Sequence, residues 1–146
     1  MEQETKNEEI EQEQVEQQAP PLFHYDLIRN DLLQELLGTE HENILYWGGK
    51  SLARKYALHT FDEIITFFAH AGWGTLEIEK NKATSKTLEL SGDWMGKNDS
   101  RCYQLEAGFL AQQIEQMQNQ MTEATYDIKR KYVVFHIKSD KHDSVS

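Results

Sequence analysis

The fold of this chain is decided by residues 99–138, which read DSRCYQLEAGFLAQQIEQMQNQMTEATYDIKRKYVVFHIK. Its first half is predicted to be a helix over about residues 101–120, with Asp99 or Ser100 as the N-terminal cap. Apolar side chains at helical spacing trace the inner face of this helix: Leu105, Phe109, Ile114, Met117 and Met121. This helix carries an alanine–glycine pair, Ala107 and Gly108, and leads directly into the second half.

The second half of the stretch alternates apolar and polar residues with period two, which is typical of strands with one buried face. The apolar positions are Ala124, Tyr126 and Ile128, then Val133, Phe135 and Ile137. The basic run Lys129–Lys131 separates the two sets and supplies the turn. We therefore expect a β-hairpin directly after the helix.

Three more helices and another hairpin are predicted upstream. The helices cover about residues 23–37, 42–58 and 60–72, and the hairpin covers residues 76–90. Thr60 and Glu63 have the spacing of a capping box. Gly48 and Gly49 interrupt the second helix, which indicates either close approach of another backbone or a break. The order ααα-ββ-α-ββ predicts an α+β domain, with the helices on one face of a four-stranded antiparallel sheet.

Charge and composition divide the chain into a tail and a domain. The net charge is −10, and seven Glu against one Lys in Met1–Gln18 account for −6 of it. This segment reads as a disordered acidic tail, or alternatively as a partner-binding helix. The tail ends at Pro20–Pro21, so we expect a tail over residues 1–21, one domain over 22–138 and a polar C-terminal tail over 139–146.

Composition also excludes several classes of function. The rest of the chain, from Ala19 onward, carries only −4, which argues against nucleic-acid and anionic-membrane partners. No apolar run is long enough to span a bilayer, and no signal peptide is present, so a cytoplasmic protein is expected. A single cysteine excludes an intrachain disulfide and a multi-cysteine metal site.

Candidate chemistry centres on Cys102, which is predicted in the first turn of a helix, where the macrodipole favours a thiolate. An inert buried cysteine is the favoured alternative. Glu106 is either a partly buried acid at the edge of a cavity or a rim residue paired with an Arg or Lys. The run from Glu40 to Glu42 is interpreted as a solvated helix start, because three consecutive residues do not face one metal ion. No metal site and no catalytic set are predicted.

Aromatic and leucine-rich segments suggest binding surfaces. Phe109, Trp47 and Trp73 are candidates for the wall of an apolar pocket, together with Cys102 and Glu106. The apolar stripe of residues 23–37 is wider than one core contact needs. We therefore expect this helix to serve both the core and a dimer contact, with the interface candidates Leu27, Leu32 and Leu36.

Four segments resemble the YslB family of small uncharacterised proteins from low-GC Gram-positive bacteria. They read FHYDLIRNDLLQELLG, ILYWGGKSLARKY, FFAHAGWG and YQLEAGFLAQQIE, and the match covers residues 23–138. More distantly, residues 108–111 before the terminal hairpin resemble the ligand-binding superfamily of NO signalling and Golgi transport, which includes 4-vinyl-reductase domains and TRAPP components.

This resemblance implies dimerisation through N-terminal helices and an apolar pocket between helices and sheet. The cysteines that bind zinc in some 4-vinyl-reductase domains are missing from the last hairpin, and no motif aligns Cys102 with the acylated cysteine of TRAPP components. The expected function is that of a non-enzymatic, dimeric domain that binds a small apolar ligand or a protein partner. The alternatives are an interaction module without a pocket and, less favoured, a thiol enzyme using Cys102. No cofactor is expected beyond a fatty-acyl chain or another small apolar molecule.

Overall fold

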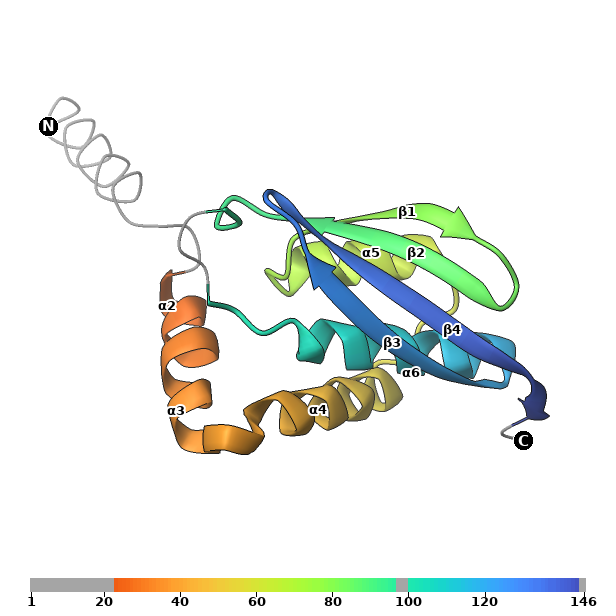
Figure 1. Ribbon diagram of the computed structural model, residues 1–146, viewed down its shortest axis with the longest axis horizontal. Helices are drawn as coiled ribbons and strands as arrows, with labels where there is room; N and C mark the ends of the chain where they lie inside the picture. Colours follow the sequence, from red (N-terminus) through yellow and green to blue (C-terminus); the bar gives the residue numbers. More distant parts are fainter. Residues whose placement is uncertain (1–22, 97–99, 145–146) are drawn as a thin grey trace, which may run out of the picture.

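The computed structural model describes residues 23–96 and 100–144, in which helices and strands follow the predicted order (Figure 1). The N-terminal helix (residues 23–37) is built from α2 (Phe23–Asp26), the π-helical segment η1 (Leu27–Leu32) and α3 (Leu33–Leu37). A 3-10 turn, η2 (Gly38–Glu40), joins it to α4 (His41–Lys55), and α5 (Phe61–His70) follows. The remaining elements are β1 (Thr75–Asn81), β2 (Ser85–Ser91), α6 (Gln104–Gln118), β3 (Gln120–Ile128) and β4 (Tyr132–Ser144).

The four strands form one antiparallel sheet in the order β1-β2-β4-β3. The two hairpins therefore meet through β2 and β4, where Leu88 lies opposite Phe135. In the last hairpin, Ala124 lies opposite Ile137. All four side chains are buried, and they give the sheet one apolar face that packs against helices. The predicted α+β class is confirmed.

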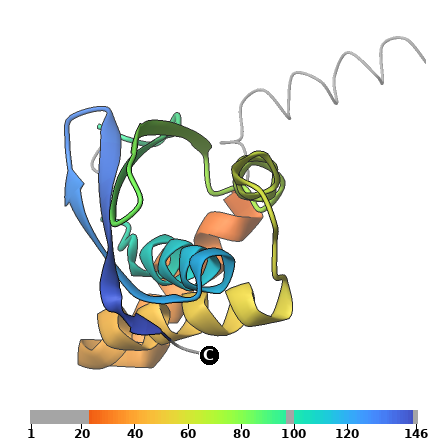
Figure 2. The ribbon, with the colours of Figure 1, turned by 90° about the vertical axis from the view of Figure 1, so that its right-hand side faces the viewer.

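Helix α6 is the centre of the domain. Figure 2 shows it between the sheet and α4, while α5 lies beside the first hairpin. Every residue from Glu106 to Ile114 is buried, so α6 is surrounded on all sides. The helices cover one face of the sheet, as predicted, and α4 reaches the core through α6.

Two glycines set the distance between α4 and α6. A Cβ atom on Gly49 would lie 2.1 Å from the carbonyl oxygen of Leu105, and one on Gly108 would lie 2.0 Å from that of Tyr46. Neither distance is physically allowed, so the two backbones touch at a point where only glycine fits. The predicted close approach is confirmed, and the alternative of a helix break is wrong, because α4 is continuous from His41 to Lys55.

Helix α6 begins at Gln104, three residues later than predicted. Ser100 does not cap it, since the N-cap position is held by Tyr103, whose side chain makes no capping hydrogen bond. Asp99 lies outside the described residues. The physical reason is that residues 101–103 are buried in an irregular segment anchored by other elements. The hydroxyl of Tyr126 accepts the backbone N–H of Tyr103 at 3.2 Å.

The start of α5 follows the predicted capping box with a small shift. Thr60 Oγ1 accepts the backbone N–H of Glu63 at 3.2 Å. The Glu63 carboxylate accepts the N–H of His59, one residue before the cap, at 3.1 Å. Both bonds satisfy amides that would otherwise lack partners at a helix start.

At the C-terminal side, β4 continues to Ser144, past the point where the polar tail was expected to begin. The acidic segment Met1–Gln18 lies outside the described residues. None of the helices within residues 23–96 and 100–144 has the length and apolarity of a membrane span.

Candidate functional site

A buried arginine on the N-terminal helix brings two of the predicted site residues together. Arg29 Nη2 donates to Glu106 Oε1 at 2.5 Å and to the carbonyl oxygen of Cys102 at 2.9 Å. Its Nη1 donates to the Tyr25 hydroxyl at 2.7 Å. Sequence reasoning missed Arg29, although its signal was present: a single basic residue inside an otherwise apolar helical stripe.

Glu106 is the acid partner of this centre. Its side chain is fully buried, and its Oε2 atom has no hydrogen-bond partner among the described residues. Neither predicted position holds, because Glu106 lies fully buried in the core and not at the edge of a cavity or on a rim. The predicted pairing with a basic group is confirmed. Burial lowers the pKa of Arg29, but the Glu106 carboxylate and the Tyr25 hydroxyl outweigh burial and leave it above its ordinary value. Arg29 therefore keeps its charge, and the two side chains form a buried salt bridge by geometry.

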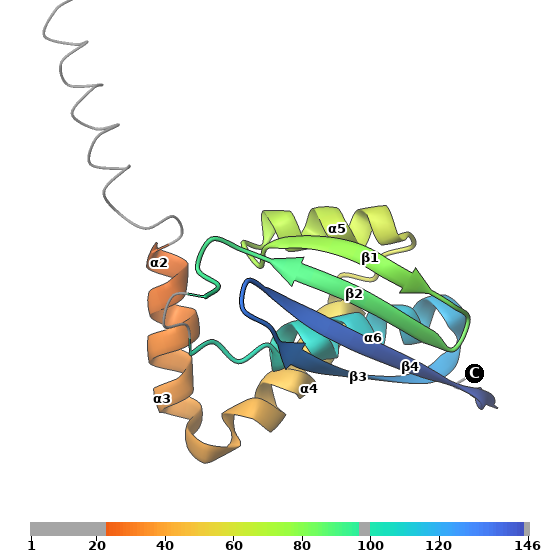
Figure 3. The ribbon, with the colours of Figure 1, turned by 45° about the horizontal axis from the view of Figure 1, so that its top comes forward.

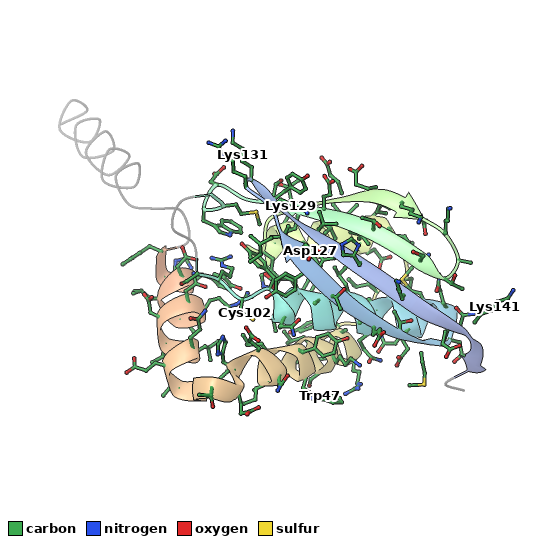
Figure 4. The ribbon with its side chains drawn as sticks, in the orientation of Figure 1. Trp47, Cys102, Asp127, Lys129, Lys131 and Lys141 are labelled. Atoms are coloured by element: carbon green, nitrogen blue, oxygen red, sulfur yellow. The ribbon has the colours of Figure 1, made fainter. Side chains whose placement is uncertain are left out.

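Cys102 lies before α6, so its predicted place in the first turn of the helix is wrong. Burial has the larger effect on the pKa of the thiol, but the backbone N–H of Gln104, the first residue of α6, still lowers it. The residue is buried, and the hydroxyl of Tyr126 donates to its sulfur at 3.8 Å. Burial raises the pKa of the Cys102 thiol, with a smaller contribution from Glu42. Figure 4 shows Cys102 on the segment that enters α6.

Phe109 and Trp73 are members of a packed aromatic cluster. The Phe109 ring stacks on Phe67 at 4.7 Å between centroids and meets Trp73 edge-on at 5.1 Å. Phe68 completes the cluster at 5.9 Å from Phe109. Phe109 is fully buried and Trp73 nearly so, and the rings fill the space between helices and sheet.

Trp47 is separated from the other pocket candidates. It is 62% exposed on α4 and points away from the sheet (Figure 4). The ammonium group of Lys50 lies 5.3 Å from the centre of its ring. The five pocket candidates thus fall into three places: the Arg29 centre, the aromatic cluster and the outer face of α4.

The N-terminal helix exposes most of its apolar side chains. Figures 1 and 3 show it at one end of the molecule, away from the sheet. Arg29 is its only buried residue. The predicted interface residues are all exposed: Leu27 by 44%, Leu32 by 47% and Leu36 by 69%. Phe23 and Ile28 are more than half exposed as well.

An open groove of about 710 Å³ lies on another side of the molecule, between α4, the end of α6 and strands β3 and β4. Its lining combines apolar and charged side chains, among them Tyr46, Met121, Lys50, Glu123, Lys138 and Lys141. The sequence did not predict it, because the lining residues come from four elements and from the turn between β1 and β2, and only the fold brings these together.

The fold is similar to that of solved structures from two other protein families. A vinyl-4-reductase family protein from Methanocaldococcus jannaschii superposes with a TM-score of 0.55 at 20% identity, covering 85% of this chain and 84% of that one. An Fe(II) unliganded H-NOX protein from K. algicida gives a TM-score of 0.50 at 17% identity, covering 76% and 71%. At these identities the likeness concerns the fold alone.

At the level of sequence, a family model described as protein of unknown function (DUF2507) matches residues 22–138, and the chain belongs to this family. It is 38% identical over 129 residues to the uncharacterised protein YslB of Bacillus subtilis (strain 168), covering 84% of this chain and 87% of that protein. The predicted resemblance to the YslB family and to the 4-vinyl-reductase fold is confirmed. The likeness to TRAPP components stays a prediction.

Proposed function

We propose that this chain is a non-enzymatic binding domain that works as a homodimer, joined through the N-terminal helix of each copy. The observation that carries the proposal is the inverted burial of this helix: it buries an arginine and leaves most of its large apolar side chains in water. Exposed apolar patches of this kind mark interaction surfaces.

Polar contacts hold the N-terminal helix on its own chain, which leaves the apolar face free. Besides the Arg29 pair, Asp26 accepts from Arg101 at 2.5 Å, and Gln34 donates to the carbonyl oxygen of Ser100 at 3.3 Å. A helix fixed in this way presents a rigid apolar surface. A second copy is the simplest occupant, because a two-fold contact pairs one patch with itself. The resemblance to the superfamily supports the same arrangement.

Ligand binding is supported by the fold class and by the groove beside β3 and β4. The groove is large enough for a small molecule. Its mixed lining, with Met121 beside Lys138 and Lys141, suits an amphipathic molecule better than a wholly apolar one.

Catalysis by Cys102 receives little support from the geometry. The thiol is buried, its raised pKa keeps it protonated at neutral pH, and its polar neighbours include the Tyr126 hydroxyl, which is a weak base. A nucleophilic thiol needs a lowered pKa or an adjacent base. We therefore assign Cys102 no catalytic role.

Static light scattering of the purified full chain tests the dimer. We expect twice the chain mass at micromolar concentration for the wild type and one chain mass for Leu36→Asp, since a charge on the apolar face opposes association. Ile128→Asp is the matched control, because Ile128 is 62% exposed but lies on β3. A monomeric wild type, or equal effects of the two substitutions, would overturn the proposal.

A second candidate function is an interaction module without a small-molecule ligand. The aromatic cluster around Phe109 favours it, because packed rings occupy the place where an internal pocket was expected. Organic extraction of the purified protein, followed by mass spectrometry, separates the two: a stoichiometric small molecule supports the ligand-binding domain, and its absence supports the module.

A further inference from the structure

Three side chains of metal-ligand type meet where α4 begins and where the chain enters α6. One ligand atom each from His41, Glu42 and Cys102 lies within 4.8 Å of the others. We propose that these residues form a binding site for a divalent transition-metal ion, with Zn²⁺ as the best match. This site is independent of the proposed dimer.

The fold brings these residues together although they are distant in sequence. His41 and Glu42 are the first two residues of α4, and Cys102 lies just before α6. The close glycine crossing fixes α4 against α6. Arg29 holds the carbonyl oxygen of Cys102 at 2.9 Å. The cysteine is therefore presented to the start of α4 by anchored backbone, and not by a chance side-chain conformation.

The donor set selects the kind of ion. Thiolate, imidazole and carboxylate are ligands of Zn²⁺ and related transition metals, whereas Mg²⁺ and Ca²⁺ prefer oxygen alone. Ligand atoms about 2.0–2.3 Å from Zn²⁺ lie about 3.3–3.8 Å apart in a tetrahedron. The present spacing requires only a small movement of exposed Glu42 and partly exposed His41 toward buried Cys102. Three protein ligands leave a fourth position for water or an external ligand.

A backbone hydrogen bond fixes one ring nitrogen of His41. Its Nδ1 lies 2.9 Å from the carbonyl oxygen of Gly38, which can only accept a hydrogen bond. Nδ1 therefore carries the proton and Nε2 keeps its lone pair. A backbone carbonyl bound to the second ring nitrogen is the usual companion of a metal-bound histidine.

Cys102 also has a suitable surrounding. The Tyr126 hydroxyl donates to its sulfur at 3.8 Å, a contact that stabilises a metal-bound thiolate. Binding replaces the thiol proton by the metal ion, and the proton leaves to solvent. The N-terminus of α4 disfavours a cation. The negative charges of Glu42 and the thiolate offset this effect, and exposed Glu42 opens an entry path.

The test is a titration of the untagged full chain, freed of metal with a chelator, with Co²⁺ and Zn²⁺. We expect one ion per chain, and a cobalt–thiolate charge-transfer band that Zn²⁺ abolishes. His41→Ala and Cys102→Ser should each weaken Zn²⁺ binding by at least about tenfold, and Cys102→Ser should remove the band. Glu42→Gln should weaken binding to a smaller degree.

His70→Ala is the matched control, since His70 is an exposed histidine at the end of α5. It should bind Zn²⁺ like the wild type. Circular dichroism reports whether each variant folds. If Cys102→Ser does not fold, the Glu42 and His41 variants still test the site, because Glu42 is exposed and His41 is partly exposed. No saturable binding, binding without the thiolate band, or equal losses in His41→Ala and His70→Ala would each overturn the proposal.

Discussion

Gly48 and Gly49 are neighbours in α4 with opposite surroundings. A Cβ on Gly49 would overlap the α6 backbone, whereas one on Gly48 would lie 3.9 Å from the nearest atom, a methyl of Leu105. Gly49 is thus required by the helix crossing, while Gly48 only weakens the helix it lies in.

Alanine substitutions should therefore have opposite signs at adjacent positions. We expect Gly49→Ala to lower the free energy of unfolding by about 1–3 kcal/mol, because the crossing must open. Gly48→Ala should raise it by up to about 1 kcal/mol through helix propensity. Urea unfolding at one fixed protein concentration measures both. Equal effects would show that the crossing does not depend on Gly49.

The Arg29–Glu106 pair is the other residue-scale feature with a clear consequence. Arg29→Met should cost about 3–5 kcal/mol, because it leaves the fully buried Glu106 carboxylate without its partner. The double variant Arg29→Met/Glu106→Leu should recover part of this loss. The exposed pair Asp127–His136, 3.0 Å apart, provides the control, and Asp127→Asn should change stability by no more than about 1 kcal/mol. Similar losses of unfolding free energy for Arg29→Met and Asp127→Asn would contradict the assignment of Arg29 and Glu106 as a stabilising buried pair.

Among the elements, the N-terminal helix is the one whose stability we expect to depend most on a partner that covers its apolar face. It contains a π-helical segment, Leu27–Leu32, and the polar contact of Arg29 with Glu106 connects it to α6. In the proposed dimer, its amides gain protection from association, whereas those of α6 are protected by the domain core.

Hydrogen exchange can separate these two sources of protection. In the monomeric Leu36→Asp variant, we expect the amides of residues 23–37 to exchange at least about tenfold faster than in the wild type, while those of α6 keep their rates. Acceleration in both elements would indicate that the substitution unfolds the domain. Unchanged rates in the N-terminal helix would contradict its place at the interface.

The elements also show how far sequence patterns reach. Helices and hairpins were predicted because their periodicity is local, and the glycine pair signalled a close crossing. The sequence does not predict the correct start of α6. Tyr126 and Arg29, which are distant in sequence, hold residues 101–103 out of the helix. The Arg29 centre and the groove arise from tertiary contacts that no periodicity encodes. Phe109 was recognised as inward-facing, but only the fold shows it stacked on Phe67.

At the scale of the whole molecule, the domain has two surfaces of different character. The N-terminal helix offers a rigid apolar face, and the groove beside β3 and β4 offers a concave surface with mixed charge. The former suits self-association, and the latter remains accessible for a ligand or partner. The proposed dimer would thus carry two copies of the groove.

Native mass spectrometry of the untagged full chain tests the dimer most directly. The account predicts a dominant species of twice the 17.1 kDa chain mass, which Leu36→Asp converts to the single chain and Ile128→Asp does not. A wild-type protein that remains a single chain at micromolar concentration would contradict the central claim.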